Sequence, residues 1–203
     1  MRIDRRVMAT TITMWLARED GDADPMAGLP AYRAALAAHF GPHRDHRAVQ
    51  LAGQLARAGF TFDAPVGWAL HLDERSLQPR TEVPAYYARR AGDPERLDAY
   101  RAELARFARE ARLDDFLDAM APTHDAEVAR VRGLLDTGAL GDLRAYYGDR
   151  GEASYALLVV PTLGGNHYGP TVRGEGVEHY QVSNTLRHGS EAGLRLALDD
   201  LLL

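Results

Sequence analysis

The segment that decides the fold is SYALLVVPTL, residues 154–163. It is short, continuously apolar and rich in β-branched residues, which is typical of a strand covered on both faces. A glycine-rich bend follows at residues 164–170, and a second strand is expected at residues 177–182. Residues 190–203 then place leucines and alanines on one face of an amphipathic helix. The C-terminal part, residues 148–203, is therefore expected to form a strand-turn-strand unit followed by a terminal helix.

The first 147 residues are expected to be mainly helical. Apolar residues at three- and four-residue spacing predict one helix from Pro30 to Phe40 and a second from a cap at Asp45 to a stop at Gly59. Residues 93–95, Asp-Pro-Glu, supply a capping carboxylate, a first-turn proline and an acidic first turn, so they predict the start of a long helix. Periodicity alone does not separate helix from strand over residues 62–72, which we assign to a helix.

Two features of this N-terminal part are expected to differ from a plain series of helices. Residues 6–17 alternate in hydrophobicity and predict a strand. Pro122 is expected to end a short helix, and Thr123 or Asp125 then opens another that runs to Gly138. Together these expectations give an α+β fold with a helical N-terminal layer and a small sheet, in a single domain over residues 1–203.

The composition excludes several classes of function. The chain has no Cys, and all 24 of its basic residues are Arg. It therefore has no disulfides, no thiolate-bound metal, no Walker lysine and no Schiff base. The net charge is -5 and the arginines alternate with acidic residues, so we expect no nucleic-acid partner. The apolar run at residues 7–17 is shorter than the roughly 18 residues of a membrane span. Because no signal-peptide cleavage site follows this run, we expect a cytoplasmic protein with no membrane partner.

Histidines and glycines provide the first candidates for a site. His39, His43 and His46 are spaced like metal ligands, but residues 41 and 42, Gly-Pro, interrupt the helix between them. We interpret them as helix-end histidines. The glycine-rich bend lacks the Gly-x-Gly-x-x-Gly spacing of a dinucleotide-binding loop. Its glycines allow close approach by a ligand or by another strand, or they form a plain tight turn.

The order of several segments resembles a bacterial family known as domain of unknown function 4932. The resemblance covers residues 5–188. It is carried by residues 32–40, 46–52, 59–65 and 69–72 and by the bend. In the bend, the family's glycine-rich turn is matched by Gly164, Gly165, Asn166, Tyr168, Gly169 and Pro170, with His167 as an insertion. The resemblance implies a zincin-like fold and a zinc-dependent peptidase of the gluzincin type, with a His-Glu-x-x-His helix. It also implies that Gly164, Gly165, Asn166 and Tyr168 contact a substrate.

The sequence departs from this family at the zinc site. His188 occupies the position of the first zinc ligand, but Gly189 and Ala192 stand where the catalytic Glu and the second His belong. A catalytic zinc takes three protein ligands, so we expect this chain to bind no zinc and to lack hydrolytic activity. The reading frame either ends or shifts before the ligand helix is complete, or the chain is a degenerate relative.

Three functions remain open on the sequence alone. In the first, the zinc-peptidase-like scaffold keeps a groove in which the edge of the strand at residues 157–163 pairs with an extended peptide. In the second, the chain is a non-catalytic protein- or peptide-binding module whose apolar C-terminal surface, residues 194–203, contacts another chain or a second copy of itself. In the third, a pair of acidic side chains performs metal-free hydrolysis. The sequence determines neither the substrate nor the oligomeric state.

Overall fold

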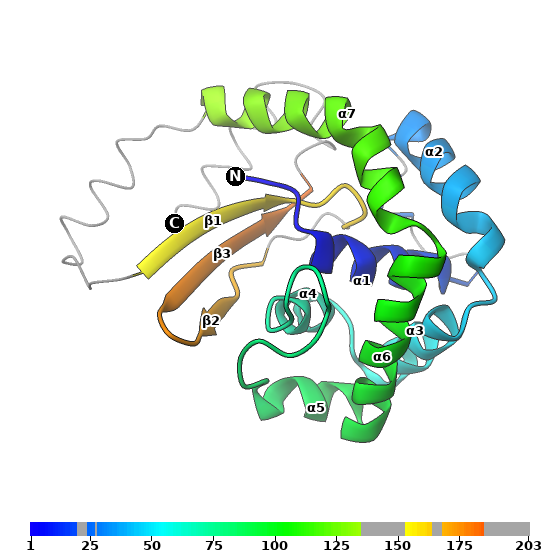
Figure 1. Ribbon diagram of the computed structural model, residues 1–203, viewed down its shortest axis with the longest axis vertical. Helices are drawn as coiled ribbons and strands as arrows, with labels where there is room; N and C mark the ends of the chain where they lie inside the picture. Colours follow the sequence, from blue (N-terminus) through cyan, green and yellow to red (C-terminus); the bar gives the residue numbers. More distant parts are fainter. Residues whose placement is uncertain (20–23, 27, 135–152, 164–167, 185–203) are drawn as a thin grey trace.

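The protein is an α+β structure in which helices surround one end of a small sheet (Figure 1). The computed structural model describes residues 1–19, 24–26, 28–134, 153–163 and 168–184. The expected α+β class is therefore confirmed for this part of the chain. Its elements are α1 (Arg5–Leu16), α2 (Pro30–Phe40), η1 (Gly41–His43), α3 (Arg47–Ala58), α4 (Asp63–Ala69), α5 (Ala85–Ala91), α6 (Pro94–Glu110), α7 (Leu113–Leu134), β1 (Ala153–Val159), β2 (Thr171–Arg173) and β3 (Val177–Ser183).

The strand predicted at residues 6–17 is wrong, because this segment forms the helix α1. The Asp4 carboxylate caps the helix by accepting hydrogen bonds from the backbone N–H groups of Arg6 and Val7. The hydroxyls of Thr10 and Thr11 donate hydrogen bonds to the backbone carbonyls four residues earlier. These bonds satisfy the polar groups, so the threonines can lie in a buried helix. Nearly every residue of α1 is buried, so the helix has no polar face to reveal its period.

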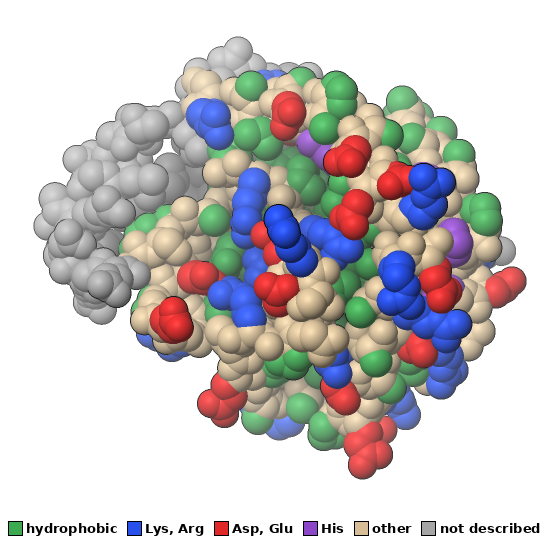
Figure 2. All heavy atoms as spheres, in the orientation of Figure 1, with side chains coloured by type: hydrophobic (Ala, Val, Ile, Leu, Met, Phe, Trp, Pro, Cys, Tyr) green, Lys and Arg blue, Asp and Glu red, His purple; other side chains and the backbone are tan. Residues whose placement is uncertain are grey.

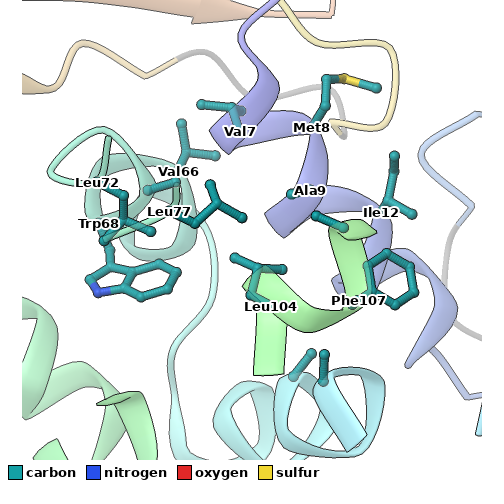
Figure 3. Close-up of a cluster of buried hydrophobic side chains, with 14 of the residues drawn as sticks. Val7, Met8, Ala9, Ile12, Val66, Trp68, Leu72, Leu77, Leu104 and Phe107 are labelled. Atoms are coloured by element: carbon teal, nitrogen blue, oxygen red, sulfur yellow. The ribbon is translucent and has the colours of Figure 1, made fainter. Parts of the chain in front are cut away.

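Helix α1 is the centre of the hydrophobic core. It contacts α3, α4 and α6. Figure 3 shows its side chains Val7, Ala9 and Ile12 among apolar side chains of the surrounding elements. The neighbours in this cluster include Val66, Trp68, Leu72, Leu77, Leu104 and Phe107. The core therefore fixes three helices around α1. Each cleft described below is lined in part by residues of these elements.

The other helical predictions are mostly confirmed. Helix α2 begins at Pro30 and ends at Phe40, and α3 ends at Gly59, whose φ of 105° is the left-handed conformation that favours glycine. Asp93 caps α6 through the N–H of Glu95, and of residues 62–72, which were assigned to a helix, residues 63–69 are helical. The predicted cap at Asp45 is wrong, because the ring of His46 accepts the hydrogen bond from the N–H of Ala48. Helix α5 was not predicted from the sequence.

The predicted break at Pro122 is also wrong, because α7 continues through it. Pro122 lies on the exposed side of the helix. On the opposite side, Phe116 precedes the proline and His124 and Val131 follow it, and all three are buried. Packing on both sides of Pro122 therefore lets the helix continue through the proline at the expense of one backbone hydrogen bond, with the bend in α7 that Figure 1 shows.

The sheet has the strand order β1-β3-β2. β1 and β3 are parallel, with Ala153 opposite Val177 and Val159 opposite Ser183, whereas β2 is antiparallel to β3. The predicted strand at residues 177–182 is confirmed as β3, and β2 was not predicted. The expectation that residues 154–163 form a strand covered on both faces is wrong in its first half, because Tyr155 is 53% exposed. The apolar run also continues beyond the strand, since β1 ends at Val159.

The carboxyl end of β1 is anchored to the helices. Asn184 holds the segment after the strand in place, because its side-chain N–H groups donate to the carbonyls of Pro161 (2.9 Å) and Leu163 (2.7 Å). The hydroxyls of Thr162 and Thr11 lie 2.5 Å apart and join this segment to α1. On the outer edge of β1, the backbone of Arg2 exchanges hydrogen bonds with Leu157 and Val159. The sheet is thereby held to the core at the end where its parallel strands finish.

Some predictions fall outside the described residues. The terminal helix at residues 190–203 and most of the glycine-rich bend, residues 164–167, belong to these parts of the sequence. Within the described part, no helix combines the length and the apolar character that a bilayer-spanning segment needs.

Candidate functional site

A cleft of about 700 Å³ opens where α1, α3 and α4 meet the carboxyl end of β1. This volume is typical of ligand sites, and the crevice beyond the carboxyl ends of parallel strands is a frequent place for them. We call it the aromatic cleft, because Trp15, Phe60, Phe62 and Tyr168 line it. Its other lining residues are Thr11, Met14, Ala17, Arg18, Glu19, Pro25, Gly53, Ala56, Arg57, Thr61, Pro65, Val66, Thr162 and Leu163.

Phe62 is the most unusual residue of the aromatic cleft. It is 66% exposed, although burying a phenyl ring away from water lowers the free energy of the system. Its φ of 59° and ψ of -116° match the first central position of a type II′ turn, which strongly favours glycine. The turn is closed by the N–H of Ala64 donating to the carbonyl of Thr61 (3.2 Å). A bulky apolar side chain is therefore held in water on a strained backbone, and such strain is concentrated at functional sites.

The polar groups of the aromatic cleft suit binding better than proton transfer. Its titratable side chains among the described residues are Arg18, Glu19, Arg57 and Tyr168. Arginine stays protonated in proteins, and the carboxylate of Glu19 forms an exposed ion pair with Arg57 at 3.2 Å. General acid-base or nucleophilic catalysis needs a reactive group next to a group that accepts its proton. The described lining of the cleft presents apolar surface with a charged rim instead.

The structure places one of the predicted substrate-contacting residues in this cleft. Tyr168 lines it, and its backbone pairs with Val182 of β3 through N–H to O distances of 3.1 and 2.8 Å. Gly164, Gly165 and Asn166 lie outside the described residues, and so does the predicted zinc ligand His188. The cleft also includes Trp15 and Phe62, which sequence reasoning missed. Their signal is weak, because the pattern of residues 6–17 suggested a strand and a positive φ at Phe62 leaves no trace in the sequence.

The histidines at positions 39, 43 and 46 serve the local structure. The ring of His39 donates to the carbonyl of Ala111 at 2.9 Å and packs against Phe116, and His46 caps α3. Both His43 and His46 lie with their rings against Phe107. Among the described residues, no three His, Asp or Glu side chains are grouped closely enough to hold a metal ion.

Two buried histidines were not singled out by the sequence. His124 is 4% exposed, and its Nε2 lies 3.0 Å from the hydroxyl of Tyr32. Burial lowers the pKa of His124 to about 4, so at neutral pH the ring is uncharged and can accept the tyrosine proton. His71 is 2% exposed; its Nδ1 lies 2.8 Å from the hydroxyl of Thr81, and its Nε2 has no hydrogen-bond partner in the described structure. Burial, followed by the charge of Arg80, lowers the pKa of His71.

A buried ion pair lies at the opposite end of α1 from the aromatic cleft. Arg6 is 2% exposed, and its guanidinium donates to the Asp4 carboxylate at 2.7 and 3.0 Å. It also donates to the carbonyls of Leu70 and Leu72, which follow α4. Burial alone would lower the pKa of Arg6, but the hydrogen bonds and charge of Asp4 raise it overall. Because all these groups are paired, we assign them to the stability of the fold.

Searches of protein-family models, curated proteins and solved structures found no match to this chain.

Proposed function

We propose that this protein is a non-catalytic peptide- or protein-binding module built on a zinc-peptidase-like scaffold. Its binding site is the aromatic cleft, and its ligand is an extended segment that inserts an apolar or aromatic side chain beside Phe62. The observation that carries this proposal is a ring that is 66% exposed on a backbone conformation favoured by glycine. A ligand side chain would remove this ring from water, which provides the free energy of binding.

The volume and the lining of the cleft favour an extended peptide as the ligand. Thr162 and Leu163 line the cleft, and the segment after β1 to which they belong is fixed by Asn184 and by the hydroxyl of Thr11. A volume of about 700 Å³ has room for several side chains, whereas the ion pair of Arg57 and Glu19 at the rim can contact polar groups of a peptide backbone. Rigid walls also limit the entropy lost on binding.

The chemistry of the lining favours binding without hydrolysis. In the described part of the cleft the only carboxylate is that of Glu19, which is exposed and paired with Arg57. Zinc chemistry would need His188 and two more ligands, and Ala192 stands where the family places the second histidine. We therefore propose that the chain binds no zinc and no other cofactor at this site.

Peptide selection followed by calorimetry tests the proposal. A displayed library of random ten-residue peptides is selected on the full chain, and the enriched peptides are synthesised with and without alanine in place of their apolar residue. We expect Phe62→Ala to weaken binding at least tenfold, which corresponds to about 1.4 kcal/mol. The matched control is Tyr155→Ala, because Tyr155 is also a large exposed apolar side chain (53%) but lies on β1, outside the cleft lining. The proposal fails if no peptide is enriched, or if both substitutions weaken binding equally.

A zinc titration separates binding from hydrolysis. We expect no stoichiometric zinc to remain on the purified chain after dialysis and no cleavage of a quenched-peptide library. A tightly bound zinc that is lost in His188→Ala, together with chelator-sensitive cleavage, would show that the chain is an enzyme and would overturn the non-catalytic proposal.

A further inference from the structure

We propose that the protein has a second binding site, a recess that holds a doubly charged oxyanion of the phosphate type. This arginine recess lies between the turn at residues 73–78, the end of α6 and the start of α7. It has a volume of about 520 Å³. Its lining consists of Arg5, Arg75, Ser76, Leu77, Gln78, Ala105, Ala108, Arg109, Arg112, Asp114 and Asp115. It shares no lining residue with the aromatic cleft, so it does not depend on the proposed peptide-binding function.

The recess exists because small and apolar side chains form its floor. Ala105 and Ala108 lie one turn apart on α6, and Leu77 is buried beside them. Arg109 and Arg112, which are both exposed, also line the recess. Figure 2 shows Arg and acidic side chains gathered over the middle of one face of the molecule, and Figure 1 draws the loop after α4 in front of α4 in the same area.

The charges in the recess do not balance. Two of its arginines are paired, since Arg5 binds Asp114 through two hydrogen bonds of 2.6 and 3.1 Å and Arg112 forms an ion pair with Asp115. The guanidinium groups of Arg75 and Arg109 have no hydrogen-bond or ion-pair partner among the described residues. The lining therefore carries two positive charges in excess, on a chain whose net charge is -5. A ligand with two negative charges would neutralise them.

The wall that presents Arg75 is rigid. The carboxylate of Asp73 accepts hydrogen bonds from the N–H groups of Arg75 (3.2 Å) and Ser76 (2.8 Å) and from the Ser76 hydroxyl (2.7 Å). The guanidinium of Arg5 also donates to the carbonyls of Glu74 (3.2 Å) and Arg75 (3.1 Å) in this turn. A turn held at so many points keeps its backbone in place without a ligand, which reduces the entropy lost when a ligand binds.

The backbone around the recess is strained in the way that binding sites often are. Leu77 and Arg112 have positive φ angles of 56° and 50°, in the left-handed region that favours glycine. Both residues line the recess. Arg112 occupies the two-residue connection between α6 and α7, where its conformation lets the chain turn and places a third guanidinium at the edge of the recess.

Phosphate fits this arrangement better than a carboxylate does. A guanidinium offers a planar pair of N–H donors that matches two oxygens of a phosphate, and the recess is lined by one such group from the turn, Arg75, and one from α6, Arg109. A dianion can bind both, whereas a single carboxylate has only one charge and two oxygens to share between them. The same dianionic group occurs in free phosphate and in small phosphate monoesters, so the experiment must compare these two sources.

Calorimetry of the full chain with inorganic phosphate tests the inference, at constant ionic strength with chloride as the reference anion. We expect saturable binding of one phosphate and at least a tenfold loss of affinity in Arg75→Gln and in Arg109→Gln. The matched control is Arg106→Gln, because Arg106 is exposed on the same helix but is paired with Glu110 outside the recess. A parallel titration with O-phosphoserine shows whether a monoester binds more tightly than free phosphate.

Two results would overturn the inference. One is the absence of saturable binding by either phosphate compound, and the other is an equal loss of affinity in Arg106→Gln, which would indicate a diffuse effect of net charge. Phe62→Ala leaves phosphate binding unchanged if the two sites are separate, so failure at one site is distinguishable from failure at the other.

Discussion

The two ends of α1 use charged and exposed groups in opposite ways. At the N-terminal end, Asp4 and Arg6 are buried together and saturate their hydrogen bonds with α1 and with the carbonyls after α4. At the C-terminal end, Trp15 and Arg18 face the aromatic cleft beside the exposed ring of Phe62. Polar groups with all their partners satisfied thus hold this fold together, whereas the exposed ring of Phe62, on a strained backbone and beside a cleft, marks the place where a ligand is expected.

The largest expected effect comes from breaking the buried pair at the N-terminal end. Asp4→Ala removes the cap of α1 and leaves the Arg6 guanidinium buried without its carboxylate. We expect the free energy of unfolding to fall by about 3–5 kcal/mol, as measured by urea denaturation. The double variant Asp4→Ala, Arg6→Met should recover part of this loss, since it leaves no unpaired buried charge. If Asp4→Ala unfolds with the wild-type midpoint, this end of α1 is not an anchor.

The next effect concerns the pH dependence of stability near the same end. His124 shares a cavity with Arg2 and Ile3, which precede α1, and burial lowers its pKa to about 4. In the unfolded chain the histidine titrates near 6.5, so between these values the unfolded state binds more protons. Stability should therefore fall as the pH decreases from about 6.5 to 4, by about 3 kcal/mol from this group.

The substitution His124→Gln isolates that contribution, because its side-chain oxygen can still accept the hydroxyl proton of Tyr32. Chemical denaturation at several pH values between 4 and 7 should show a shallower decline for the variant than for the wild type. Equal slopes for the two proteins would mean that His124 is accessible to protons in the folded state.

A smaller effect on stability is expected beside the C-terminal end of α1, and here the substitution should stabilise the protein. Phe62→Gly removes a side chain from a backbone conformation that glycine adopts freely. We expect this variant to gain about 1 kcal/mol of stability, measured as a higher midpoint of denaturation, and to lose peptide binding. A variant that is both less stable and still able to bind peptides would remove the distinction between the two ends of α1.

The smallest effect is expected for the rim of the aromatic cleft. Arg57→Gln breaks an ion pair whose partners are both more than half exposed, so the free energy of unfolding should change by less than about 0.5 kcal/mol. The difference between the losses of unfolding free energy in Asp4→Ala and in Arg57→Gln shows how much more a buried ion pair contributes to stability than an exposed one. A loss of several kcal/mol in Arg57→Gln would show that the rim pair is structural.

The sequence predicted those elements whose signals are local. Asp93 before Pro94 predicted the start of α6, Gly59 predicted the end of α3, and the β-branched run predicted β1, although not where it ends. It failed for α1, because a helix that is buried on most sides has no polar stripe, and its alternating pattern indicated a strand. It also failed at Pro122, because the packing of Phe116 and Val131 outweighs a local preference that the sequence does express.

The sites were less predictable than the fold. Tyr168 was expected to contact a substrate and does line the aromatic cleft, but Trp15 and Phe62 arrive there through the packing of α1 against α4. In the same way, Arg75 and Arg109 lie far apart in the sequence, and only the packing of the turn after α4 on α6 brings them to one recess. Such sites depend on contacts between distant segments, which local patterns do not encode.

The most direct test of the central claim is a two-dimensional ¹H–¹⁵N NMR titration of the full chain with the tightest selected peptide. We predict that the amide shifts concentrate on Trp15, Phe62 and Thr162, around the aromatic cleft, and that they vanish in Phe62→Ala. Shifts that concentrate on β1 around Tyr155, or that persist unchanged in Phe62→Ala, would contradict the account.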